Sequence, residues 1–187
     1  SGNAANSRVI GAIREVLFAP EQHEAVVARI ADPACHIVSF TVTEKGYARA
    51  ADGSLDFAAA RQSFYPLLGE ALARRRAAGL AGVTLLSCDN LAHNGAVLQR
   101  LTSEWIEAED PALADWFEQH CTCPSTMIDR IVPRSLGEDL HDLEARIGLR
   151  DEGAVFTERF SQWVIEDRFA GSRPRWRRHG VQLVADV

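Results

Sequence analysis

Residues 84–101, TLLSCDNLAHNGAVLQRL, contain the transition that decides the fold. The run that begins at Gly82 and ends at Cys88 is short and apolar, which is typical of a buried strand. Beyond it, Val97, Leu98 and Leu101 recur at helical spacing. A buried strand that leads directly into an amphipathic helix predicts an α/β unit with parallel strands.

Polar residues close this strand, and an Asn-Gly pair stands where the helix should begin. Asp89 and Asn90 suit a helix cap or a turn, so a purely local role also accounts for them. Ligands in open α/β sheets, however, bind outside the carboxyl ends of the strands. Two other predicted strands end in a similar way, at Thr-Glu-Lys 43–45 and at Asp-Arg 129–130. Three such ends on one rim favour a binding site.

The rest of the chain alternates between helix and strand patterns. Pro20 is expected in the first turn of the helix over 19–32, and Asp110 is expected to cap the helix over 109–120. Helices are predicted over 19–32, 63–79, 109–120 and 136–148, and strands over 36–43, 125–133, 159–169 and 180–187. The predicted fold class is α/β, with a Rossmann-like, mostly parallel sheet and flanking helices in one domain over 1–187.

Composition limits the classes of function. The chain has 187 residues, 47% of them hydrophobic and 25% charged, and a net charge of −6. An acidic balance disfavours nucleic acid as a partner, so the basic segment 173–179 is expected to be a solvated loop. No apolar run approaches the ~18 residues that a membrane span needs, and the start lacks a signal-peptide pattern. Four cysteines without a disulfide spacing indicate a cytoplasmic protein.

A zinc site is the alternative considered for Cys121 and Cys123, which flank Thr122 next to His120. Two thiolates and one imidazole leave a structural site one ligand short of four. The sequence offers no fourth ligand at a suitable spacing. We therefore expect two small buried residues and no metal.

Four segments together resemble a known family. They are TVTEKGY (41–47), LLSCDNLAHNG (85–95), PSTMIDRIVP (124–133) and FSQWVIEDRFAGSRPRW (160–176). In this order they resemble the polyol-specific long-chain dehydrogenases, the mannitol dehydrogenase family. Within it, STMIDRIVP and QWVIEDRF look closest to the fructuronate reductase (D-mannonate oxidoreductase) branch.

The resemblance implies NAD-dependent hydride transfer between a polyol or aldonate and its ketose or keto-uronate, with no metal. It implies that Asn90 holds the developing oxyanion, a role that suits an amide donor. It also implies that Asp129 borders the substrate and the proton path. Thr43, Glu44 and Lys45 are expected to line the cofactor cleft, and Lys45 is not expected to be the catalytic base.

Two family motifs are missing from these residues. The family's Gly-x-Gly-x-Phe-x-Arg turn, which holds the dinucleotide pyrophosphate in the first βαβ unit, does not occur. Neither does its Lys-x-x-x-Leu-Asn-Gly-x-His segment, which carries the catalytic lysine in a helical C-terminal half. The chain thus resembles the middle of a longer enzyme, and the remaining N- and C-terminal portions are its expected partners. Mannitol 2-dehydrogenase, or a non-catalytic domain fragment of such an enzyme, is the alternative.

Overall fold

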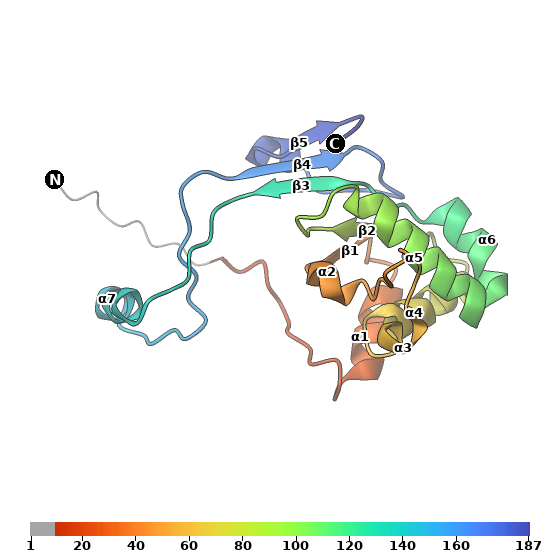
Figure 1. Cartoon of the computed structure of the whole chain (residues 1–187), viewed down its shortest axis with the longest axis horizontal. Helices are drawn as coiled ribbons and strands as arrows, with labels where there is room; N and C mark the ends of the chain where they lie inside the picture. Colours follow the sequence, from red (N-terminus) through yellow and green to blue (C-terminus); the bar gives the residue numbers. More distant parts are fainter. Residues whose placement is uncertain (1–9) are drawn as a thin grey trace.

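Strand β2 (Thr84–Ser87) is buried along its whole length and pairs in parallel with β1 (Ile37–Phe40) in the computed structural model, which describes residues 10–187 (Figure 1). The continuous apolar run that predicts β2 therefore matches its environment. The helices are α1 (His23–Ala31), α2 (Thr43–Gly46), α3 (Phe57–Ala60), α4 (Tyr65–Ala77), α5 (Asn94–Glu109), α6 (Pro111–His120), α7 (Gly137–Ile147) and the 3₁₀ turn η1 (Trp176–His179).

A second sheet has the order β3 (Thr126–Asp129), β4 (Gln162–Glu166), β5 (Gln182–Val184). The expected parallel pairing is confirmed for β1 with β2 and for β4 with β5, but β3 and β4 are antiparallel. The reason lies in residues 130–161, which leave the end of β3, carry α7 and return to the same edge. A connection that returns in this way joins antiparallel strands, whereas parallel strands need a crossover.

Two predicted boundaries are wrong near the first strand. The first helix begins at His23, and Pro20 lies in the turn that precedes it. The predicted strand 36–43 ends at Phe40 and is followed by the single turn α2. The carboxylate of Asp89 explains this early end, because it accepts hydrogen bonds from the backbone N–H groups that follow the strand and holds Thr43 at a φ of 61°.

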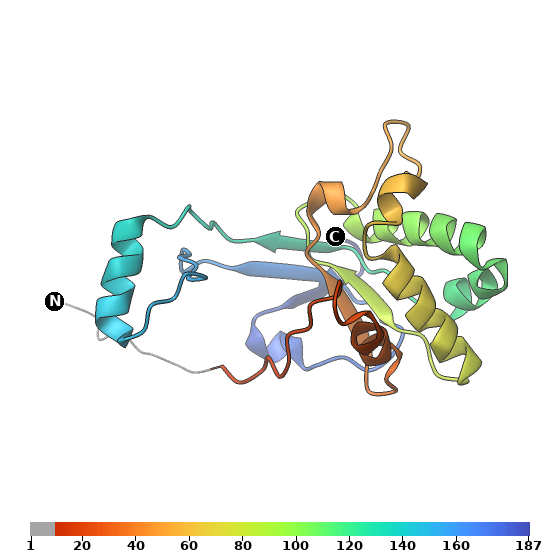
Figure 2. The same cartoon turned by 90° about the horizontal axis from the view of Figure 1, so that it is seen from below.

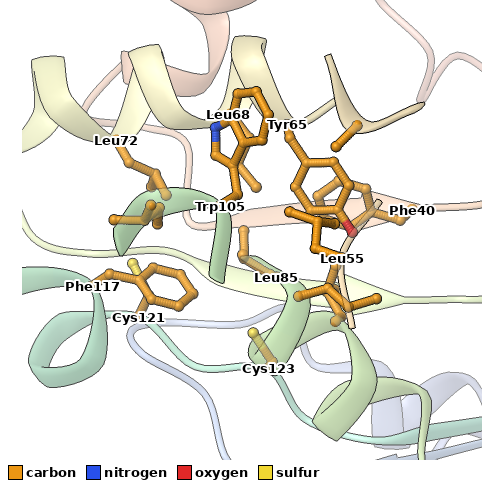
Figure 3. Packing of buried hydrophobic residues seen from close by; sticks show 14 of the residues in the cluster. Phe40, Leu55, Tyr65, Leu68, Leu72, Leu85, Trp105, Phe117, Cys121 and Cys123 are labelled. Carbon is orange, nitrogen blue, oxygen red and sulfur yellow. The ribbon is translucent and has the colours of Figure 1, made fainter. Parts of the chain in front are cut away.

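The hydrophobic core lies between the first sheet and helices α4, α5 and α6 (Figure 3). Leu98, Leu101 and Trp105 line the buried face of α5, as their spacing predicts. Cys121 and Cys123 are also part of this core. Burial raises the pKa of both thiols, that of Cys121 to about 11, so they are protonated at neutral pH.

Residues 130–161 form an arm that projects from the body, with α7 at its far end (Figures 1 and 2). No residue of α7 is buried. Large apolar side chains are exposed along the arm: Ile131, Val132, Leu136, Ile147, Leu149, Val155 and Phe160. Among the described helices, none is long and apolar enough to cross a membrane.

Candidate functional site

A cleft of about 390 Å³ opens where β2 and β3 end and β4 begins. Its walls combine polar and charged groups with one aromatic ring. The lining residues are Cys88, Ile128, Asp129, Arg130, Ser161, Gln162, Trp163, His179, Gly180 and Val181. Its volume falls within the range of small-molecule sites, roughly 300–1,000 Å³. The cleft lies at the position where the carboxyl-end rule for open α/β sheets expects a ligand.

The charged groups of this cleft are available to a ligand. Asp129 and Arg130 are both exposed. The Nε of Arg130 donates to the carbonyl of Phe160 at 3.3 Å, and the guanidinium forms no ion pair with any carboxylate of residues 10–187. The buried indole Nε1 of Trp163 also has no acceptor among the described residues. Of these two groups, the guanidinium of Arg130 is the hydrogen-bond donor that the cleft presents to a ligand.

Cys88 contributes a thiol to the same cleft. Burial, followed by the neighbouring charge of Asp89, raises its pKa to about 11. A thiol with such a pKa is protonated at neutral pH and is a poor nucleophile. Cys88 therefore contributes to the shape of the cleft and not to its reactivity.

Asp89 joins the ends of the two parallel strands. Its carboxylate accepts from the backbone N–H of Val42 at 3.1 Å and of Thr43 at 3.0 Å, and from the hydroxyl of Tyr47 at 3.0 Å. That hydroxyl also lies 2.5 Å from Oγ of Ser87, and burial raises the pKa of Tyr47 above its ordinary value. These bonds occupy both carboxylate oxygens, so Asp89 holds α2 in place.

The predicted site residues fall into separate places. Asp129 lines the cleft, whereas Asn90 is exposed in the loop that leads to α5. Thr43, Glu44 and Lys45 belong to α2. The last two line a different hollow of about 440 Å³, together with Arg49 and Ala50. The structure therefore brings Asp129 next to the end of β2, whereas Glu44 and Lys45 open onto a neighbouring hollow.

Asn94 is the residue at this site that the sequence analysis missed. It is fully buried at the start of α5, and its side chain bonds to Asp89 and to Thr126 across the rim. Its only signal in the sequence is the Asn-Gly pair at an unexpected position. Local rules explain such a pair as a turn or a cap, but the side chain of Asn94 does neither.

Two further predictions concern charge and metal. In the basic segment 173–179, Arg173 and Arg177 both form ion pairs with Asp167, at 2.9 and 3.5 Å. The segment is thus partly neutralised, which agrees with a solvated loop. Within residues 10–187, no group of three or more His, Cys, Asp or Glu side chains is arranged to hold a metal ion.

Comparison with known proteins gives concordant results. The chain is 39% identical to a mannitol 2-dehydrogenase of Pyricularia oryzae, over 100% of this chain and 40% of that protein. It is 42% identical to a D-mannonate oxidoreductase of Escherichia coli, over 96% of this chain and 40% of that one. The structure of the Pseudomonas fluorescens mannitol 2-dehydrogenase ternary complex with NAD and D-mannitol matches with a TM-score of 0.86 and 34% identity, over 95% of this chain and 38% of that chain.

The chain spans about two-fifths of the length of these relatives. Residues 1–178 match the family described as the mannitol dehydrogenase Rossmann domain. The parallel pairing of β1 with β2, followed by polar residues at the ends of both strands, agrees with that description. The chain belongs to the mannitol dehydrogenase family.

Proposed function

We propose that the chain is part of a cytoplasmic, NAD-dependent oxidoreductase that interconverts fructuronate and mannonate. The observation that carries the proposal is the cleft at the ends of β2 and β3, where Asp129 lies together with Arg130, which has no ion-pair partner among residues 10–187. A six-carbon open chain fits a volume of about 390 Å³. Its many hydroxyl groups need the donors and acceptors that line this cleft.

Arg130 favours a sugar acid over a neutral polyol as the substrate. A guanidinium presents several donors in a plane and binds a carboxylate through two parallel hydrogen bonds. Mannonate and fructuronate carry such a carboxylate, whereas mannitol and fructose have a hydroxymethyl group at that position. Mannitol 2-dehydrogenase activity is the alternative, and Asp129 would then bond a hydroxyl at the same end.

The remaining roles in this proposal are those that the resemblance to the family implies. The amide of Asn90 would donate to the substrate carbonyl as it gains negative charge. The carboxylate of Asp129 would accept or relay a proton at the mouth of the cleft. A lysine from a C-terminal helical portion would complete the proton transfer. In this proposal residues 1–187 form the later part of the N-terminal domain of the longer enzyme.

NAD, when bound, supplies or accepts the hydride. The chain fits one side of a dinucleotide site only. Lys45 and Arg49 place two cations at the hollow beside α2, and Glu44 adds an acceptor for hydroxyl groups. Because these residues include no Gly-rich turn for a pyrophosphate, that turn would come from an N-terminal portion.

The direct test is NADH oxidation by the longer enzyme that contains the chain, and by the chain itself, with fructuronate, tagaturonate and fructose offered in turn; a longer enzyme that turns over fructose or tagaturonate but not fructuronate would contradict the proposal. Turnover with fructuronate at a kcat/KM well above the other two supports the proposal. A preference for fructose would instead support mannitol 2-dehydrogenase. A folded protein that turns over none of the three would contradict an activity of the chain by itself.

Substitution of Arg130 tests the choice of substrate class without requiring turnover. Arg130→Gln is expected to weaken mannonate binding about tenfold or more, because it removes a charge-assisted pair worth about 1.5–3 kcal/mol. Mannitol binding is expected to change less than twofold. Isothermal titration of both ligands into both proteins measures this, and Arg130→Lys serves as the control that keeps the charge. Equal losses for the two ligands would contradict a role in carboxylate recognition.

A second candidate function is packing against partner regions without catalysis by the chain itself. Exposed apolar residues favour it: Ile13 and Val16 are 78% and 85% exposed, and Leu149 of the arm is 66% exposed. Apolar surface of this kind marks contact sites. Light scattering and sedimentation should then show self-association of the chain, whereas a single monomeric species would count against this function.

A further inference from the structure

The rim that carries the candidate site spans two sheets that are not joined there by a strand ladder. β2 belongs to the first sheet and β3 to the second. Within residues 10–187, no backbone hydrogen bond joins β2 to β3. The start of β2 is joined to the segment before β3, where the N–H of Leu85 donates to the carbonyl of Thr122 at 2.8 Å and the N–H of Thr122 donates to the carbonyl of Val83 at 3.3 Å. Asn90 follows the carboxyl end of β2, and Asp129 is the last residue of β3. Side chains must therefore fix the distance between the two groups.

Asn94 makes this connection with every polar atom of its side chain. Its Nδ2 donates to the carbonyl of Asp89 at 2.9 Å, to the carbonyl of Thr126 at 3.0 Å and to Oγ1 of Thr126 at 3.1 Å. Its Oδ1 accepts from the N–H of Thr126 at 2.9 Å. The hydroxyl of Thr126 in turn donates to the carbonyl of Ser87 at 2.6 Å. Asn94 thus binds the residue before Asn90 and the first residue of β3.

Close packing of the backbone makes this geometry possible. Asn94 and Thr126 are buried, at 0% and 6% exposure. The next residue is Gly95, where a Cβ atom would lie 2.5 Å from the carbonyl oxygen of Cys123. Only glycine allows the start of α5 to approach the strand segment so closely. The Asn-Gly pair therefore acts as a unit, in which Gly95 provides the approach and Asn94 makes the bonds.

We infer that Asn94 is a positioning residue that sets the relative placement of Asn90 and Asp129 through Asp89 and Thr126. The inference rests on the proposed function for the roles of those two groups, but its physical content is a link between two strand ends. Loss of the link lets the two ends move relative to each other while the core that contains β1 and β2 stays folded. The link can hold the two strand ends in one arrangement, because a buried hydrogen-bond network in which each member is satisfied is rigid.

The first experiment measures the link by amide hydrogen exchange, which needs no activity. Asn94→Ala and Thr126→Val are expected to raise exchange in residues 87–91 and 126–129 about tenfold or more under native conditions, because they open this unit locally. Thr126→Ser keeps the hydroxyl and is expected to exchange at the parent rate. Leu98→Ala, in the core face of the same helix, is the control for a general loss of stability. Equal exchange in these segments for Leu98→Ala and Thr126→Val would overturn the inference.

The second experiment uses kinetics in the protein that turns over substrate. Thr126→Val is expected to lower kcat about tenfold or more with the KM for NADH changed less than twofold, and Thr126→Ser is expected to restore kcat. A general loss of structure would not give this split or this rescue. If the longer enzyme that contains the chain has no turnover, the proposed function fails, and hydrogen exchange alone decides whether the link exists. An unchanged kcat in both Asn94→Ala and Thr126→Val would overturn the positioning role.

Discussion

At the scale of single residues, Gly95 shows how closely the candidate site depends on backbone approach. Its neighbours across the gap are backbone atoms, the carbonyl oxygen of Cys123 at 2.5 Å and the carbonyl carbon of Pro124 at 2.6 Å from a hypothetical Cβ. Backbone atoms cannot rotate away as the end of a long side chain can. A methyl group at this position must therefore push α5 away from the segment before β3.

Gly95→Ala is accordingly expected to destabilise the fold by roughly 3 kcal/mol, the upper part of the range for overpacking. Gly137→Ala is the matched control, because Gly137 also lies in the first turn of a helix and has no atom within 4 Å of its Cβ position. There alanine is expected to be neutral or stabilising by up to about 1 kcal/mol. Urea unfolding of both variants measures the difference, and similar midpoints would contradict the packing argument.

The residues of the site differ in how well the sequence predicts them. Asp129 could be placed in a cleft because strand ends in open α/β sheets follow a general rule. Asn94 could not be identified, because its partners lie at Asp89 and at Thr126, and no local pattern relates α5 to β3. A side chain whose partner is distant in the sequence leaves only an anomaly, here an Asn-Gly pair without a local role.

At the scale of the elements, β4 is tied to the segment before β3 by Glu166. Its carboxylate accepts from the N–H of Ser125 at 3.0 Å and from Nε of Arg168 at 3.0 Å. Arg168 also donates to the carbonyl of Cys123 at 3.0 Å. Burial by itself would raise the pKa of Glu166, but the hydrogen bonds from Ser125 and Arg168 outweigh it and lower the pKa below its ordinary value.

This lowered pKa predicts how stability changes with pH. Because the folded protein binds the Glu166 proton more weakly than the unfolded chain does, the contribution of its carboxylate is present above the unfolded pKa, about 4.3. It is lost as the pH falls through the lower, folded value. Glu166→Gln is therefore expected to cost about 1–2 kcal/mol at pH 7, and the difference from the parent should vanish toward pH 3. A difference that stays constant between pH 7 and pH 3, measured by urea unfolding, would contradict this account.

The elements themselves were predicted best where a pattern is long or buried. Helix α5 was predicted from the helical spacing of Leu98, Leu101 and Trp105, and β2 was predicted from its apolar run. The predicted end of β1 is wrong because hydrogen bonds to Asp89, which lies outside the segment, decide it. The predicted start of α1 is wrong because a turn closed by hydrogen bonds to the carbonyl of Phe18 precedes the helix. The antiparallel pairing of β3 with β4 also depends on where the arm returns, which periodicity does not report.

At the scale of the whole molecule, the arm of residues 130–161 is the part held least firmly to the body. α7 buries no residue, and its ion pairs are with its own flanking segment, as in Arg150 with Glu144 and Glu152. Segments with few buried contacts open at low cost in free energy. The body, by contrast, is held by the core between the first sheet and its helices (Figure 3).

Limited trypsin digestion is expected to cut the arm first, after Arg134, Arg146, Arg150 or Arg159. The clipped protein should keep its cooperative unfolding, with a Tm within a few degrees of the parent, because the cuts leave the core intact. Mass spectrometry of the first fragments identifies the sites. Early cleavage after Arg75, which is 2% exposed in α4, would contradict this order of stability.

The antiparallel pairing of β3 with β4 has a consequence for how substrate preference diversifies in such a protein. Since β3 ends and β4 begins at the cleft, the single excursion between them carries Arg130 at its departure and Ser161 at its return. One continuous insert thus supplies a wall of the cleft, while the core residues lie elsewhere in the chain. Exchange of residues 130–161 between relatives would therefore change this wall of the cleft as one unit. Substrate specificity can then change while the core, and with it the stability of the fold, stays the same.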